Sequence, residues 1–305
     1  MKNNIVFILV SLFLFLNPSP LRAEESFKST LNPSATEIYR REPLKTVFSW
    51  KNISKKDQKL FIQSQEFFIY VAFGSEEFKR YRLFYPEEEE RLEHLSPIWS
   101  ISALLKPQQV HEHRRWLLLA QRDGNSQWDF LFDKPGTYHI SMNADGKDAV
   151  QIIVKDLTLK ADQQALKFFS KDAAEFFLGE KFSMKEGESL LKKVFSKYPK
   201  SFYAPYAALG LAGQIWQKQS GFDLDFPSFA KYSDFIINKH PQNRPLFEEA
   251  LFMTAQALVF QKGGQEKALE YFSILQKEFP TSGYLQQLEE QYGIGLELIP
   301  SVHQP

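Results

Sequence analysis

Apolar residues in the first half of the chain fall in short runs that are rich in β-branched and aromatic side chains. The runs between Thr36 and Asp156 include KTVFSW, YRLFY and PIWSISALL. Short runs of this kind, separated by polar and turn-forming residues, are typical of β-strands. The pattern therefore predicts that the N-terminal half is built from strands.

Two Asp-Gly pairs mark positions where neighbouring strands reverse direction. Asp123-Gly124 separates RRWLLLAQ from QWDFLF, and Asp145-Gly146 separates TYHISM from AVQIIV. Asp-Gly accepts the positive φ angles of tight turns, so both pairs predict antiparallel hairpins. Several short strands at close spacing predict an antiparallel β-sandwich, which we expect to occupy residues 24–157.

One strand pair carries a resemblance to a known class of domain. FDKPGTYHISM, which runs from Phe132 to Met142, resembles the closing strands of extracellular, immunoglobulin-like sandwich domains. In those domains a Pro-Gly turn leads into a Thr-Tyr pair that enters the core. Cupredoxins share the pattern but complete it with a cysteine copper ligand, and this chain contains no cysteine. The resemblance implies a fold only, and we expect no copper.

The hydrophobic period changes to that of helices after about Leu157. In GESLLKKVFSKY, for example, Leu191, Val194 and Tyr198 fall on one helical stripe together with Leu190 and Phe195. We therefore expect a helical domain over residues 158–300, followed by a short tail at 301–305.

Three similar pentapeptides divide the helical half into units. KYPKS, KHPQN and EFPTS place Pro199, Pro241 and Pro280 about 40 residues apart. Because proline cannot continue a helix, each is expected to follow a helix end. The Ser or Asn two residues after each proline can cap the next helix. These residues are Ser201, Asn243 and Ser282.

The helical half resembles the tetratricopeptide-repeat family. The best match is KALEYFSILQKEFP, which carries Ala268, Phe272, Leu275 and Pro280 at the family's spacing. The first unit places Gly187, Leu191, Val194 and Pro199 similarly, whereas the middle unit departs with Phe229 and Ser233. The resemblance implies about three degenerate helix pairs from Leu159 to about Tyr292. The alternative is another helix-pair solenoid or bundle.

The N-terminus has the pattern of a secretory signal peptide. Lys2 precedes an apolar run from Ile5 to Leu16, and Ala23 is a small residue suited to cleavage. The run is about 12 residues long, too short to span a bilayer. We therefore expect residues 1–23 to be removed and the mature protein to be periplasmic or secreted from a bacterial cell. Cleavage near Ala23 removes two cations and leaves 35 basic against 37 acidic residues. Because proteins that bind nucleic acids usually have a basic surplus, we expect no nucleic-acid partner.

Candidate catalytic and metal-binding motifs are sparse. His111 and His113 would share one side of a strand, but no third ligand is evident. The run Glu87–Glu90 lacks the Asp, Asn and Gly residues of calcium loops and suits the first turn of a helix. The chain has no nucleophile elbow, zinc-protease helix or phosphate loop. We therefore predict no enzyme, no catalytic residues, no metal and no cofactor, although glycosidase carboxylates leave no local spacing to find.

From these observations we predict that the protein acts as an adaptor or scaffold, which binds partner proteins in the bacterial envelope. Tetratricopeptide surfaces bind peptides or partner helices, and on FYAPYAALGLAGQIWQK the candidate contacts are Tyr206 and Trp216. Burial of both side chains between helices is the competing interpretation. A second hypothesis is glycan or surface-polymer binding by the sandwich through FKRYRLFY and the tryptophans near it. A third is an enzyme that acts on envelope polymers.

Overall fold

The computed structural model describes six ranges of the chain: 26–63, 68–84, 100–125, 127–179, 184–218 and 224–285. The predicted signal peptide, the run Glu87–Glu90 and the predicted tail lie outside these ranges.

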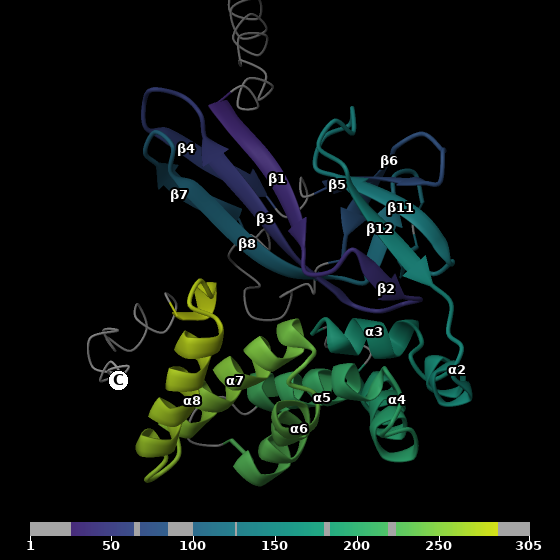
Figure 1. Ribbon diagram of the computed structural model, residues 1–305, viewed down its shortest axis with the longest axis vertical. Coiled ribbons are helices and arrows are strands. Elements are labelled where there is room, and N and C mark those ends of the chain that lie inside the picture. Colours follow the sequence, from purple (N-terminus) through teal and green to yellow (C-terminus); the bar gives the residue numbers. More distant parts are fainter. Residues whose placement is uncertain are drawn as a thin grey trace, which may run out of the picture.

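Strands make up the N-terminal half in the described residues (Figure 1). They are β1 (Phe27–Pro33), β2 (Glu37–Tyr39), β3 (Leu44–Asn52), β4 (Gln58–Gln63), β5 (Phe68–Phe73), β6 (Lys79–Leu83), β7 (Ser100–Leu105), β8 (Val110–Leu117), β9 (Leu119–Arg122), β10 (Asp129–Phe130), β11 (Gly136–Ser141) and β12 (Val150–Lys155).

The strands form three sheets around one apolar core. The largest has seven strands in the order β10-β9-β6-β5-β11-β12-β2, a second has the order β1-β3-β8, and the third pairs β4 with β7. Alternate residues of β3, such as Phe48 and Trp50, point into the core with Ile69 and Ile140 from the large sheet. Alternation of this kind follows from the two-residue period of a strand.

Helices make up the C-terminal half, and in the described part of the chain none has both the length and the apolar surface to cross a membrane. They are α2 (Lys160–Leu166), α3 (Lys171–Phe177), α4 (Met184–Lys197), α5 (Ala204–Lys218), α6 (Phe226–Lys239), α7 (Arg244–Val259) and α8 (Gln265–Glu278). Neighbours in sequence from α3 onward pack against one another, and α5 also contacts α3 and α7.

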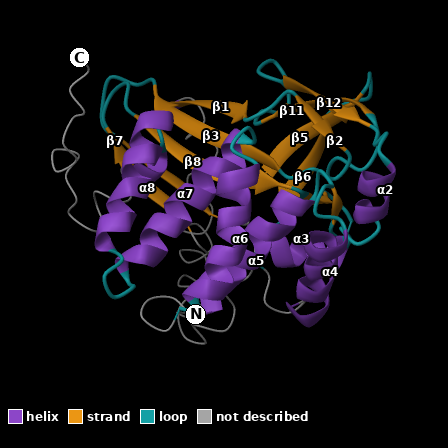
Figure 2. Cartoon of the chain, turned by 60° about the horizontal axis from the view of Figure 1, so that its bottom comes forward, coloured by secondary structure: helices purple, strands orange, loops and turns teal. Residues whose placement is uncertain are grey.

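The predicted architecture, an antiparallel sandwich followed by a separate tetratricopeptide-like array, is wrong. The seven-stranded sheet is mixed, because β2 pairs in parallel with β12 through Val154 and Ile38. The helices are also not a separate domain, since Leu118, between β8 and β9, and Leu119, in β9, share one buried cluster with Phe176 and Leu251 from the helices. Figure 2 shows the helices gathered against the sheets. Local hairpin signals specify neighbouring strands but not the partner of an edge strand such as β2.

The local predictions for turns and helix ends are confirmed. Helices α4, α6 and α8 end two residues before Pro199, Pro241 and Pro280. The two Asp-Gly pairs lie in the β9–β10 and β11–β12 hairpins, with φ of 81° at Gly124 and 63° at Gly146. These features depend on a few adjacent residues, which is why the sequence alone reveals them.

The three predicted capping residues behave differently from one another. The backbone N–H of Tyr284 donates to Ser282 Oγ at 3.2 Å, as expected of a capping side chain. Asn243 holds the N-cap position of α7 but makes no capping bond with its side chain. Ser201 Oγ is buried and has no hydrogen-bond partner among the described residues. Both exceptions line a cavity where the sheets meet the helices.

Candidate functional site

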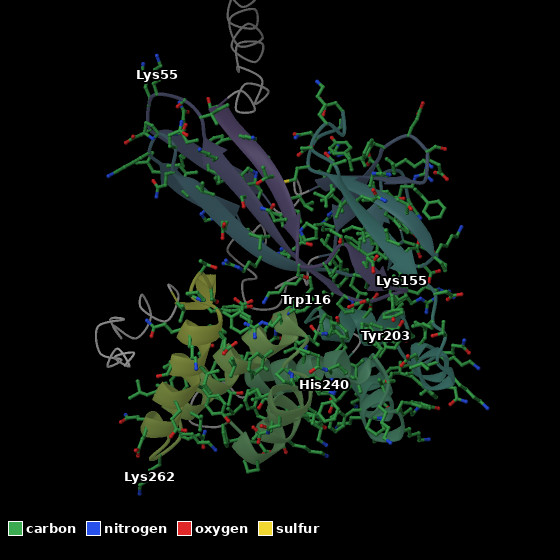
Figure 3. The ribbon with its side chains drawn as sticks, in the orientation of Figure 1. Lys55, Trp116, Lys155, Tyr203, His240 and Lys262 are labelled. Carbon is green, nitrogen blue, oxygen red and sulfur yellow. The ribbon has the colours of Figure 1, made fainter. Side chains whose placement is uncertain are left out.

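The candidate site lies where β3 and β8 meet α5 and α7, around Trp116 (Figure 3). Two cavities open there, and Trp116 contributes to the lining of both. We call the cavity of about 450 Å³ the Trp216 cavity and the cavity of about 540 Å³ the Glu42 cavity, each after one of its lining residues. Concave sites with a few polar groups among apolar walls are where proteins usually bind ligands.

A buried lysine holds the two halves of the molecule together at this point. Lys45 in β3 is only 6% exposed, and its Nζ lies 3.2 Å from Glu249 Oε2 and 3.4 Å from Glu248 Oε2, both in α7. Nζ also donates to Tyr284 Oη at 3.2 Å. Burial alone would lower the pKa of Lys45, but Glu249, Tyr284 and Glu248 outweigh it and raise that pKa. Lys45 is therefore a stable cation between sheet and helix.

One of these carboxylates, that of Glu249, also fixes the ring of Trp116. Trp116 Nε1 donates to Glu249 Oε2 at 3.0 Å, and the ring packs edge-on against Phe177 and Tyr206. Because the indole N–H is satisfied and both ring neighbours come from helices, the wall shared by the two cavities is preorganised.

Aromatic side chains dominate the Trp216 cavity. They are Phe84, Trp116, Phe177, Trp216, Phe252 and Tyr284. Phe252 and Tyr284 stack with ring centroids 4.2 Å apart, and Trp216 remains only partly buried beside Phe260. The charged groups at this cavity include Arg114, Arg115 and Glu249.

A carboxyl group of unusual pKa lies in the Glu42 cavity. The hydroxyl of Tyr206 donates to Glu42 Oε1 at 2.6 Å, and the backbone N–H of Tyr39 donates to Oε2 at 2.7 Å. Asn243 Nδ2 in turn donates to Tyr206 Oη at 3.3 Å. Burial raises the pKa of Glu42 to about 7, although both hydrogen bonds act to lower it. At neutral pH this group can therefore be either an acid or a carboxylate.

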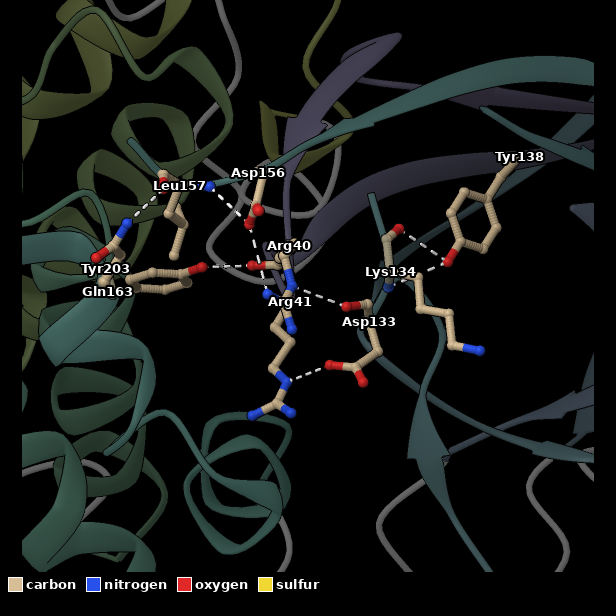
Figure 4. Close-up of polar contacts among 9 residues, drawn as sticks. All are labelled: Arg40, Arg41, Asp133, Lys134, Tyr138, Asp156, Leu157, Gln163 and Tyr203. Carbon is tan, nitrogen blue, oxygen red and sulfur yellow. Dashed lines mark hydrogen bonds and ion pairs between the residues drawn. The ribbon is translucent and has the colours of Figure 1, made fainter. Parts of the chain in front are cut away.

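A further group of polar contacts lies near the junction between strands and helices (Figure 4). The hydroxyl of Tyr203 donates to the backbone carbonyl of Arg40. Arg40 and Arg41 both bind Asp133, whose loop leads into β11. Gln163 in α2 donates to the carbonyl of Leu157 at 2.8 Å. Of these contacts, the hydrogen bond from Tyr203 to Arg40 joins the helical half to the strands, and Asp133 in turn holds Arg40 in place.

The two predicted partner contacts are placed differently. Tyr206 is 2% exposed, and its hydroxyl is used by Glu42 and Asn243, so its side chain is internal. Trp216, further along the same helix, lines the Trp216 cavity and is partly exposed. Both residues lie at the candidate site, but each lines a different cavity.

His111 and His113 share one side of β8, as the two-residue period predicts. Their cross-strand partners are Trp50 and Phe48. Arg115 Nε donates to His113 Nε2 at 2.8 Å, and burial, Arg115 and His111 lower the pKa of His113 to about 4. In the described ranges no group of three acidic or imidazole side chains is placed to hold a metal ion.

The aromatic and basic residues of the glycan hypothesis contact one another. The guanidinium of Arg80 lies 3.5 Å from the ring centroid of Phe68, and that of Arg82 lies 5.7 Å from the ring of Trp128. Trp50 is 5% exposed within the strand core. Trp99 lies outside the described residues.

The residues that organise the site were not evident from the sequence. Glu42 and Lys45 look like ordinary polar positions near the start of a strand. Glu248 and Glu249 carried a weak signal, because they are adjacent acids in α7, a helix with buried residues on most of its surface. A charged pair on such a helix requires a buried partner, which sequence alone does not identify.

Comparisons with known proteins give little further information. No protein-family model matches the chain, and no curated protein matches it. Among solved structures, a β-glucosidase from Erythrobacter marinus is 14% identical with a TM-score of 0.26, covering 43% of this chain and 15% of its own. A β-glucosidase from Listeria innocua in complex with gluconolactone is 16% identical with a TM-score of 0.25, covering 44% and 17%. The chain thus spans less than a fifth of either neighbour.

The prediction that the chain is not an enzyme is withdrawn, since the two solved structures reported above are enzymes. That prediction came from missing local motifs, and carboxylates brought together by a fold leave no such motif. TM-scores near 0.25 carry no argument for a fold or a reaction, so we assign no activity from the likeness.

Proposed function

We propose that the chain is an exported protein–protein interaction protein that takes up a segment of a partner protein in the Trp216 cavity. The observation that carries this proposal is the set of six aromatic side chains lining one open cavity, with two arginines beside them. Aromatic residues and arginine are enriched where protein partners bind tightly, because they offer large contact areas at low entropic cost.

The walls of the cavity are ready to receive a partner without rearrangement. Trp116 is held by Glu249, and Tyr284 is held by Lys45 and stacked on Phe252. Preorganised walls reduce the entropic cost of association. Trp216 is accessible to a partner, since it is partly exposed and its side chain lines the cavity. Export follows from the pattern between Lys2 and Ala23 and places the partner in the envelope or outside the cell.

The test is in-cell crosslinking of the tagged full-length chain, followed by mass spectrometry, for the unaltered protein and for Trp216→Ala. We expect one or a few protein partners that disappear with Trp216→Ala while the thermal unfolding transition stays nearly unchanged. The matched control is Phe61→Ala, which removes a 51% exposed aromatic ring on β4, a strand that contributes nothing to the cavity lining. Partners retained by Trp216→Ala, or lost equally with Phe61→Ala, would contradict the proposal.

A further inference from the structure

The Glu42 cavity contains a carboxyl group without a cationic partner. In the ranges that the structure describes, neither a lysine nor an arginine forms an ion pair with Glu42. Its two hydrogen bonds come from neutral donors, Tyr206 and the backbone of Tyr39. A carboxylate in such a place is costly, and a bound cation would remove the cost.

Further hydrogen-bond acceptors line the same cavity. Ser201 is 1% exposed, and its Oγ has no partner among the described residues. Asn243 uses Nδ2 to bind Tyr206 and does not cap α7, so its carbonyl oxygen Oδ1 is available. Glu42, Asn243 and Ser201, each of which carries an acceptor oxygen, all line this cavity.

None of the basic side chains that line the cavity forms an ion pair with Glu42 among the described residues. Arg244 binds Glu278 through both terminal nitrogens and lies 4.1 Å from the ring centroid of Phe279. Burial and the neighbouring Lys239 lower the pKa of His240, so its imidazole is neutral at neutral pH. Lys200 is exposed on the turn after α4. None of them supplies the charge that would balance Glu42.

Aromatic rings complete the walls. Phe202 and Tyr206 lie with their ring centroids 5.6 Å apart, and Trp116 lies 6.2 Å from Tyr206. All three line the Glu42 cavity. Ring faces beside a carboxylate attract cations, since the ring quadrupole adds to the charge interaction.

We propose that the Glu42 cavity binds a primary ammonium group, carried by an alkylamine or by a lysine side chain. Its three N–H donors match the acceptors on Glu42, Asn243 and Ser201, and its alkyl stem lies against Phe202 and Tyr206. The proposal concerns a different cavity from that of partner uptake, so either can fail without the other.

Binding of this kind has a defined pH dependence. The ammonium stays protonated up to about pH 10, whereas Glu42 loses its charge as the pH falls through about 7. The other groups facing Glu42 are the backbone N–H of Tyr39 and the hydroxyls of Tyr203 and Tyr206, whose pKa values are raised by burial, together with Lys200, His240 and Arg244 at the cavity walls. Affinity should therefore fall by up to about tenfold per unit below pH 7.

The experiment is isothermal titration calorimetry of the purified exported protein with n-pentylammonium and, as the uncharged match, n-pentanol. We expect saturable binding of pentylammonium at pH 8.0, no binding of pentanol, and at least about tenfold weaker binding at pH 5.5. Glu42→Gln should weaken binding by about tenfold or more at pH 8.0, and Phe61→Ala, on an exposed ring outside the cavity lining, should leave it unchanged. If Glu42→Gln does not fold, the pH dependence of the unaltered protein carries the test.

Several results would overturn the proposal: no saturable binding of pentylammonium, equal binding of pentanol, or affinity independent of both pH and Glu42→Gln. Titration with Nα-acetyl-lysine amide distinguishes the two sources of the ammonium group, a free alkylamine and a lysine side chain. Binding as tight as that of pentylammonium supports a lysine of a protein, and exclusion of this larger probe supports a free alkylamine.

Discussion

The hydroxyl of Tyr206, in α5, donates a hydrogen bond of 2.6 Å to Oε1 of Glu42, in the turn before β3, across 164 residues of sequence. The contact joins the helices to the strands inside a cavity, where the carboxyl group is largely removed from water. Its removal should be visible in stability and in titration, because burial and this hydrogen bond act on Glu42 in opposite directions.

Replacing Tyr206 by Phe should lower the free energy of unfolding by about 1–3 kcal/mol, because Glu42 and Asn243 both lose a buried partner. The pKa of Glu42 should rise further, since the hydrogen bond that holds it down is gone. Urea unfolding and ¹³C NMR titration of the Glu42 carboxyl measure the two effects. Tyr271→Phe, on the half-buried side of α8, is the matched control and should change neither quantity.

The pH dependence of stability should contain two opposing contributions. Glu42 has its pKa raised from 4.5 to about 7, so its contribution is fully present below pH 4.5 and is lost as the pH rises to 7. His113 has its pKa lowered from 6.5 to about 4, so its contribution is present above pH 6.5 and is lost as the pH falls to 4. Each amounts to about 3 kcal/mol at most.

Single substitutions should separate the two contributions. Relative to the unaltered protein, Glu42→Gln should gain stability as the pH rises from 4.5 to 7, and His113→Gln should lose stability over a similar window. Chemical unfolding at half-unit pH steps measures both slopes. Equal slopes for all three proteins would show that neither side chain titrates as the structure implies.

Replacing Lys45 by Met should cost about 3–5 kcal/mol of unfolding free energy, because Glu248 and Glu249 would remain partly buried without their cation. Changing both acids to Gln in the same chain should restore much of the loss, since no uncompensated charge then remains. Thermal and urea unfolding of the single and triple variants gives the coupling. Lys147→Met, which breaks an ion pair to Asp145 from an 86% exposed side chain, should have no measurable effect.

Two helical glycines should respond oppositely to alanine. A Cβ at Gly187 would lie 2.4 Å from the carbonyl oxygen of Asp172 and 2.5 Å from Phe176 Cβ, so Gly187→Ala should destabilise the fold by about 1–3 kcal/mol. A Cβ at Gly213 would meet nothing closer than Met253 at 4.0 Å. Gly213→Ala should therefore stabilise α5 by up to about 1 kcal/mol. Thermal unfolding of the two variants, made in parallel, distinguishes close helix packing from simple helix propensity.

Features that depend on a few neighbouring residues were predictable from the sequence. The helix ends before Pro199, Pro241 and Pro280, and the hairpins at Gly124 and Gly146, follow from backbone chemistry within one turn of the chain. The side-by-side placement of His111 and His113 follows from the strand period in the same way.

The tertiary structure decided everything that joins distant segments. The parallel pairing of β2 with β12 depends on core packing across more than a hundred residues, and no local pattern specifies it. The side chains of Ser201 and Asn243 were expected to cap helices, but neither makes a capping bond, and both residues line the Glu42 cavity. Lys45 could be recognised as a buried cation only once α7 brought Glu248 and Glu249 to it, because the charge of a buried group is stabilised by neighbours that the fold supplies.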